Sequence, residues 1–283
     1  MSENRIRPIK AYKNAAFLNS PSARMIRILS EMVEPDSRLR KYKVRNTVVF
    51  FGSSRFISRD KADSNLQEVR AKMAQQIPLE PHALEIAERD LRLSRYYEDA
   101  AELSERLTLW FKKLESEGIR AHICTGGGPG IMEAANLGSS RAKGRSVGFN
   151  ISLPMEQWPN AFQTRELSFE FHYFFIRKFW FVYLAKALIV FPGGFGTFDE
   201  LFELLTMIQT RKTTKSLPVV LYGSEYWNDV VHFDSMVKWG TISPEDRELF
   251  AVFDDVDQAY AYLEKELTEH FVKFERARNR KKG

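Results

Sequence analysis

The stretch ALIVFPGGFGTFDELFELLTMIQT, residues 187–210, decides the fold. It opens with an apolar run to Phe191, which predicts a buried strand, and continues through the glycine-rich loop PGGFGT at 192–197. The sequence from Phe198 to about Thr210 then has the spacing of a helix. A strand, a glycine loop and a helix in this order are typical of α/β proteins, in which such a turn follows a parallel strand.

The same order occurs a second time, because the loop TGGGPG at 125–130 follows a predicted strand and precedes the helical sequence IMEAANLGSSRAKG. The predicted strands are apolar along most of their length, which favours a parallel sheet covered on both faces. We therefore predict an α/β fold with a doubly wound, Rossmann-like parallel sheet. The strands are expected at 46–52, 120–124, 146–151, 167–171, 187–191 and 217–222, the last closing the series.

The predicted domain organisation is one Rossmann-like domain over residues 46–272, with a basic accessory segment at 1–45 and a basic tail at 273–283. The tail lacks apolar periodicity and is expected to be solvated. The accessory segment contains a helical run that we expect to stop near Pro35, because proline cannot continue a helix at low cost. Further helices are expected in part of an insertion at 56–85, at 83–117, at 174–185, and from about 225 and 256.

Charge and cysteine content exclude several classes of protein. The single cysteine, Cys124, excludes a disulfide framework and is expected to be a buried, reduced thiol of a cytosolic protein. Residues 1–45 carry 11 Lys and Arg against 4 Asp and Glu, whereas residues 46–272 carry 25 against 32. An acidic body argues against specific nucleic-acid binding. No signal peptide or membrane span is visible, so we expect a soluble, cytoplasmic protein that does not bind membranes.

The two glycine loops are the candidate ligand site. Backbone N–H groups in such turns can approach an anion, and the dipole of the following helix favours phosphate. Neither loop has the spacing of the usual dinucleotide or Walker A motifs, and glycines can also serve only to allow tight turns. The candidate substrate-binding residues in and beside these loops are Gly52, Ser53, Gly126, Gly127, Gly128, Gly193, Gly194, Gly196 and Thr197.

Charged residues beside these loops are the candidate catalytic groups. Residues 171–183 contain 8 of the 37 aromatic residues, yet Arg177 and Lys178 lie among them. Either these cations extend to the edge of a core helix, or a buried guanidinium has an anionic partner such as phosphate or the Glu200 carboxylate. Glu200 lies in the first turn of its helix, where it either complements the helix dipole or acts in catalysis.

Several motifs together resemble the LONELY GUY family, in its longer form. They are FGSSR at 51–55, TGGGPGIMEAANLG at 125–138, the pair Arg177-Lys178, and PGGFGTFDE at 192–200, with Arg177 and Pro192 15 positions apart. The resemblance covers residues 46–222 and implies hydrolysis of the N-glycosidic bond of nucleoside 5′-monophosphates such as AMP. It implies Glu200 and Arg177 as catalytic residues, Lys178 in substrate binding, no metal or other cofactor, and a homodimer formed through the aromatic segment.

The chain also departs from the family pattern. Short members have a histidine two residues before the arginine, whereas Phe175 stands there and His172 lies further upstream. Members are often labelled lysine decarboxylases, but no motif for a pyridoxal phosphate lysine is visible. A noncatalytic nucleotide- or phosphate-binding module of the same fold is the alternative. The presence of both Arg177 and Glu200 favours the enzyme, while the preferred base is not predicted by the sequence.

Overall fold

In a computed structural model, residues 7–153, 158–212 and 217–280 are described. They contain a seven-stranded sheet, parallel throughout, with the order β4-β3-β2-β1-β5-β6-β7. The doubly wound, Rossmann-like prediction is confirmed. The strands are β1 Thr47–Phe51, β2 His122–Thr125, β3 Ser146–Ile151, β4 Ser168–Phe171, β5 Ala185–Val190, β6 Val219–Tyr222 and β7 Ala251–Phe253.

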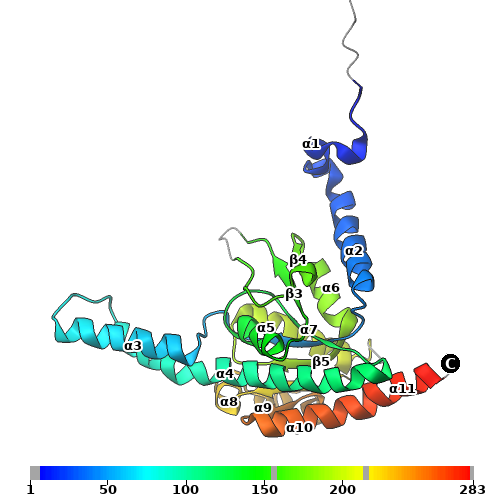
Figure 1. Cartoon of the computed structure of the whole chain (residues 1–283). Helices are drawn as coiled ribbons and strands as arrows, with labels where there is room; N and C mark the ends of the chain where they lie inside the picture. The colour runs from blue at the N-terminus through cyan, green and yellow to red at the C-terminus, as the bar shows by residue number, and fades with distance from the viewer. Residues whose placement is uncertain (1–6, 154–157, 213–216, 281–283) are drawn as a thin grey trace, which may run out of the picture.

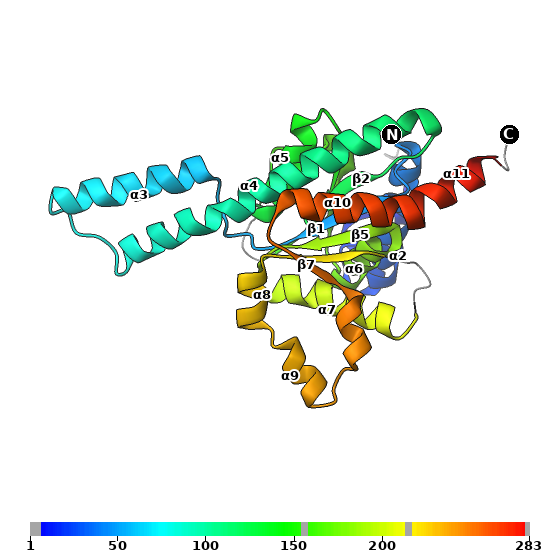
Figure 2. The same cartoon turned by 90° about the horizontal axis from the view of Figure 1, so that it is seen from below.

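Helices cover both faces of the sheet (Figures 1 and 2). Along β1, Val48 and Phe50 pack on the side of α4, α5 and α10, whereas Val49 and Phe51 pack on the side of α6 and α7. This alternation buries every residue of the strand, which explains its apolar sequence. The helices are α1 Ala15–Leu18, α2 Arg24–Lys41, α3 Arg59–Ala74, α4 Ala83–Leu114, α5 Ile131–Arg141, α6 Phe174–Leu184, α7 Phe195–Gln209, α8 Ser224–Val230, α9 Phe233–Lys238, α10 Val256–Leu267 and α11 Lys273–Arg280.

Two helical segments extend away from the sheet. The insertion forms α3, which packs against the first part of α4 as a projecting hairpin (Figure 1). The whole stretch from Ala83 to Leu114 is a single helix, and Gly118 follows it with a φ of 74°. On another side, α1 and most of α2 project beyond the sheet (Figure 1). Neither projection contributes a strand to the sheet.

The predicted end of the first long helix near Pro35 is wrong, because α2 continues to Lys41. Proline has no N–H, so the carbonyl oxygen of Glu31, four residues earlier, loses its helical donor. Trp180 Nε1 on α6 donates to this oxygen at 3.1 Å. The tertiary contact therefore replaces the hydrogen bond that Pro35 removes.

One prediction needs correction at the C-terminal end of the chain, and a second feature there was not predicted. The strand at 217–222 does not close the series, because β7 pairs with β6 at the sheet edge. The segment predicted as a basic tail forms the helix α11 over residues 273–280, and most of its residues are exposed. Arg276 binds both carboxylate oxygens of Glu117 at 2.6 and 2.9 Å, and Asn279 Nδ2 donates to the Glu117 carbonyl oxygen at 3.0 Å. Residues 281–283 lie outside the described residues.

Cys124 is fully buried in the sheet, as predicted. Burial raises the pKa of its thiol, so the thiolate form is disfavoured. No helix among the described residues is long and apolar enough to cross a membrane.

Candidate functional site

The candidate site lies where the direction of the strand order reverses. From β1 the chain adds β2, β3 and β4 on one side, and it then returns to place β5 on the other side of β1. The chain therefore leaves the neighbouring strands β1 and β5 in different directions at the carboxyl edge of the sheet, which is where ligands bind in open α/β folds. The Ser53 N–H donates to the Pro192 carbonyl oxygen at 2.9 Å and holds these two loops together.

A cavity of about 670 Å³ opens at this edge. It brings together residues from the loops after β1, β2, β3 and β5, from the ends of β1 and β3, and from the helices α5, α6, α7 and α8. Two of the predicted site residues, Gly127 and Lys178, are not among those that line it. The predicted residues that do line it are Gly52, Ser53, Gly126, Gly128, Arg177, Gly193, Gly194, Gly196, Thr197 and Glu200.

Gly130 fixes the loop after β2 against the loop after β1. Its φ is 71°, in the left-handed region that favours glycine, and a Cβ there would overlap the Ser53 carbonyl oxygen. The next residue, Ile131, donates its N–H to that same oxygen at 3.0 Å. A side chain at position 130 would therefore push apart two loops that form the cavity.

The N-terminus of α7 points backbone donors at the cavity. Gly194 is the N-cap residue and supplies no side chain, while the N–H groups of Phe195 and Gly196 have no acceptor among the described residues. The space around the Cα atoms of Gly194 and Gly196 is open to at least 4 Å where a Cβ would point. Unpaired N–H groups and the positive end of a helix dipole together form an anion-binding site.

Glu200 is a buried carboxyl at the wall of this cavity. It lies on the first turns of α7 and is only 6% exposed. Burial raises its pKa to about 7, while the positive charges of Lys178 and Arg177 oppose this rise. The group is therefore divided between its acid and carboxylate forms near neutral pH, which suits a group that exchanges protons with a reacting molecule.

Lys178 is the cation in contact with Glu200. Its Nζ lies 3.8 Å from Glu200 Oε2, 2.9 Å from Asp199 Oδ2 and 2.7 Å from Glu203 Oε2. The ion pairs with Asp199 and Glu203 raise the pKa of Lys178 despite partial burial. Lys178 therefore acts on the site through the carboxylates of α7. Among the described residues there is no group of three or more His, Cys, Asp or Glu side chains suited to a metal.

Arg177 projects from α6 into the cavity wall without a carboxylate partner within 4 Å among the described residues. Its guanidinium carbon lies 5.1 Å from the Phe174 ring centre and 5.7 Å from that of Phe181, and its Nε is buried without a hydrogen bond. Burial lowers its pKa, and Glu200 is the largest opposing influence. A partly buried guanidinium without a carboxylate partner favours an anionic ligand.

The structure adds lining residues that were not among the predicted site residues. Arg55 ends the FGSSR motif, so its position after β1 could have indicated it, whereas Tyr226 follows β6 and nothing in the sequence links it to the loops. Tyr226 donates its hydroxyl to the Gly193 carbonyl oxygen. Phe175 and His172 do not line the cavity. The added lining residues include Ser54, Arg55, Met132, Asn150, Leu153, Phe174, Phe198 and Tyr226.

Fold and site together define a Rossmann-like α/β protein with a cavity at the strand-order reversal. A family model described as "Possible lysine decarboxylase" matches residues 132–263. Cytokinin riboside 5′-monophosphate phosphoribohydrolase LOG2 of Arabidopsis thaliana is 30% identical over 86 residues, covering 30% of this chain and 40% of that protein. LOG3 of the same plant is 40% identical over 67 residues, covering 23% and 30%.

These matches confirm the resemblance to the LONELY GUY family that the sequence motifs indicate. The chain spans about 30–40% of the length of these curated relatives. A solved structure titled as the molybdenum cofactor carrier protein of Chlamydomonas reinhardtii is 16% identical, with a TM-score of 0.42, and covers 79% of this chain and 99% of its own.

Proposed function

We propose that the protein hydrolyses the N-glycosidic bond of nucleoside 5′-monophosphates such as AMP and releases the free base and ribose 5-phosphate. The observation that carries this proposal is Glu200, a buried carboxyl with a pKa of about 7 in the same cavity as two glycine loops and the unpaired Arg177. The relatives named above are phosphoribohydrolases, which supports the same class of reaction.

In this proposal the 5′-phosphate binds the N–H groups at the start of α7, with Thr197 and the loop after β2 around it. Arg177 supplies the positive charge that a buried phosphate requires. Apolar side chains from Met132, Leu153 and Phe198 also line the cavity and suit the flat faces of a base. The nucleotide would then place its ribose between the phosphate cradle and these apolar side chains.

Glu200 would act on the bond between the ribose and the base. As that bond breaks, C1′ becomes positively charged, and an ionised Glu200 stabilises the charge. A water molecule forms the new bond at C1′ and gives a proton to the Glu200 carboxylate, while the bonding electrons leave with the base. The protonated Glu200 or solvent returns the proton to the base, which restores the carboxylate. A pKa near 7 allows both proton transfers at neutral pH.

The family model's description raises lysine decarboxylation, and the cavity does not fit the pyridoxal phosphate that such an enzyme needs. That cofactor forms a Schiff base with a lysine side chain. Among the described residues, none that lines the cavity is a lysine, and Lys178 is bound to the carboxylates of Asp199 and Glu203.

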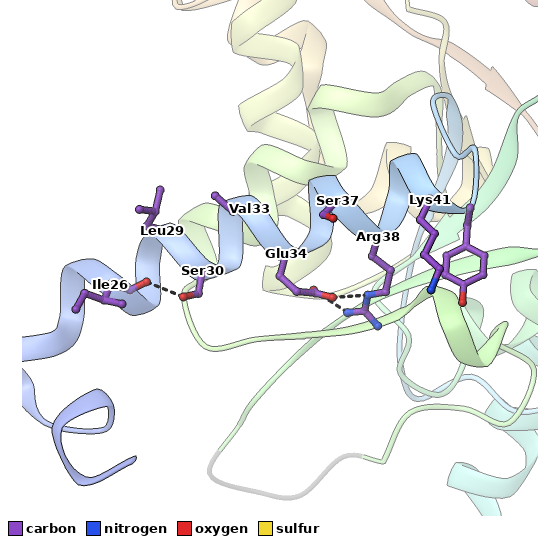
Figure 3. Close-up of a pocket in the computed structure, with 9 residues that line it drawn as sticks. Ile26, Leu29, Ser30, Val33, Glu34, Ser37, Arg38 and Lys41 are labelled. Carbon is purple, nitrogen blue, oxygen red and sulfur yellow. Dashed lines mark hydrogen bonds and ion pairs between the residues drawn. The ribbon is translucent and has the colours of Figure 1, made fainter. Parts of the chain in front are cut away.

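We also propose a homodimer. On α6, the side chains of Phe175, Phe179 and Tyr183 recur every four residues and are 59, 40 and 53% exposed. On α2, the exposed side chains of Leu29 and Val33 line a shallow groove formed by α2 and Tyr42 (Figure 3). Residues 1–45 are basic and residues 46–272 are acidic, so this N-terminal segment complements the body of a second copy in charge.

The test of the reaction is chromatography of free base over a panel of nucleoside 5′-monophosphates incubated with the purified protein. Release of base together with an equal amount of ribose 5-phosphate is the expected result. Tight binding of a monophosphate with no release of base would contradict hydrolysis and support the noncatalytic binding module instead.

A further inference from the structure

A cluster of amide side chains lies behind the loop Gly126–Gly128. Asn160 Nδ2 donates to the carbonyl oxygens of Gly127 at 3.1 Å and Gly128 at 2.9 Å, and the Asn160 N–H also donates to the Gly127 oxygen at 2.9 Å. Gln163 Nε2 adds a donor to the Gly127 oxygen at 2.7 Å. Asn160 and Gln163 belong to the segment between β3 and β4. They therefore fix a loop that follows a different strand.

The Asn160 side chain is in turn bound by buried polar residues of the core. Asn136 Oδ1, on α5, accepts hydrogen bonds from Asn160 Nδ2 at 3.0 Å and from Thr125 Oγ1 at 2.8 Å. Thr125 Oγ1 in turn accepts the Gly127 N–H at 3.0 Å. Thr125 and Asn136 are fully buried, and Asn160 is 9% exposed. The orientation of the Asn160 amide is therefore determined by the core rather than by solvent.

This arrangement determines where the next N–H points. A trans peptide is planar, so the Gly128 N–H points away from the Gly127 carbonyl oxygen. That oxygen faces Asn160 and Gln163, which do not line the cavity, whereas Gly128 does line it. The Gly128 N–H has no acceptor among the described residues. It is therefore a free donor on the cavity side of the loop.

The loop would not hold this orientation alone. Glycines on both sides of the 127–128 peptide impose little steric barrier to its rotation, and the φ of Gly127 is 75°. A rotated peptide would present a carbonyl oxygen to the ligand instead of a donor. The Arg177 guanidinium lies beside this loop, because its Nη1 is 3.9 Å from the position of a Cβ on Gly126. A donor and an unpaired cation at one loop favour an anionic group.

We propose that Asn160 is a positioning residue, which holds the 127–128 peptide so that the Gly128 N–H binds an oxygen of the nucleotide's 5′-phosphate. The inference rests on the proposed function for the identity of the ligand. Asn160 acts through the loop and does not itself touch the substrate. Gln163 assists it through the shared Gly127 oxygen.

The test compares Asn160→Leu with the parent protein, because leucine has a similar volume and introduces no charge. Asn46→Leu is the matched control, since Asn46 Nδ2 also donates to a backbone carbonyl oxygen, that of Arg120 at 2.8 Å, at the opposite edge of the sheet. Calorimetric titrations with AMP, adenosine and inorganic phosphate are made for each protein. We expect Asn160→Leu to lower the AMP affinity at least tenfold and the adenosine affinity by less than twofold, with both affinities unchanged in Asn46→Leu.

Equal losses for AMP and adenosine in Asn160→Leu, or unchanged AMP affinity, would overturn the proposal. If Asn160→Leu does not fold, Gln163→Leu takes its place. We expect Gln163→Leu to lose AMP affinity threefold without a matching loss for adenosine, and an unchanged AMP affinity would refute the proposal. A parent protein that binds AMP without hydrolysing it contradicts the proposed reaction but leaves the Asn160 comparison intact. A parent protein that binds neither AMP nor phosphate refutes both.

Discussion

Replacing Glu200 with glutamine should make the protein more stable in alkaline solution. In the unfolded chain this carboxyl titrates near 4.5, whereas burial raises its pKa to about 7 in the folded protein. Between these values the folded state holds a proton that the unfolded state has lost, so the free energy of unfolding decreases as the pH rises through this window. The full difference corresponds to about 3 kcal/mol and is reached above pH 7.

Glutamine is neutral and close in shape to the protonated acid, so Glu200→Gln removes this penalty. Relative to the parent, the variant should gain up to about 3 kcal/mol more at pH 8.5 than at pH 5, an upper estimate because solvent can enter the cavity. The assay is urea denaturation of both proteins at the two pH values. A gain in stability that is the same at both values would refute the claim that burial destabilises the carboxylate.

Glu203→Gln is the matched control for that measurement. Glu203 lies one turn further along α7, is partly exposed, and binds Lys178 Nζ at 2.7 Å. Its removal should stabilise the protein far less at pH 8.5, because the change breaks an ion pair with Lys178 and relieves only the repulsion that Glu203 exerts on Glu200. A protein that keeps a destabilising carboxylate in its ligand cavity is expected to use that group in function.

Four other outcomes follow from the same contacts. Adenosine should be hydrolysed at least about 100-fold more slowly than AMP, since it lacks the phosphate that α7 and Arg177 bind. Equal rates in the chromatographic assay would contradict a phosphate-binding site at α7 and Arg177. Arg177→Ala should weaken AMP binding at least about tenfold and also reduce kcat, because the guanidinium has no carboxylate partner and is available to bind the phosphate. An unchanged AMP affinity in calorimetry would contradict a role of Arg177 in phosphate binding. The value of kcat/KM should rise with pH through about 7, the pKa of Glu200. In Lys178→Met the midpoint of this rise should move to higher pH, because Lys178 is the largest influence that lowers the pKa of Glu200. An unchanged midpoint would exclude this coupling between Lys178 and Glu200. Deletion of residues 273–283 should lower the midpoint of thermal unfolding, because the Arg276–Glu117 contacts are lost, while kcat stays within about twofold of the parent value. A large fall in kcat of the folded truncated protein would show instead that α11 supports the cavity.

Much of the sheet could be predicted because its strands are continuous apolar runs with glycine loops after them. The loop at 192–197 and the loop at 125–130 meet at the strand-order reversal, which is a property of the topology that the alternating pattern implies. The strand β7 could not be predicted in this way, because three residues, Ala251–Phe253, are too few to show a pattern.

Other features depend on contacts between distant segments. Pro35 would end an isolated helix, and the hydrogen bond from the Trp180 side chain, which is distant in the sequence, helps α2 to continue past it. The tail forms α11 because Glu117, far along the chain, supplies carboxylate and carbonyl partners for it. The amide cluster around Asn160 draws its members from three separate segments, so no local motif reveals it.

The central claim is that an ionised Glu200 stabilises positive charge at C1′ in the transition state. It is tested most directly by measuring kcat for AMP hydrolysis and the AMP affinity of the parent protein and of Glu200→Gln. We predict that kcat falls about 100-fold or more, equivalent to about 2.7 kcal/mol, while AMP affinity is retained or increased because a carboxylate near the phosphate has been removed. A folded Glu200→Gln protein that binds AMP and hydrolyses it at the parent rate would contradict the claim.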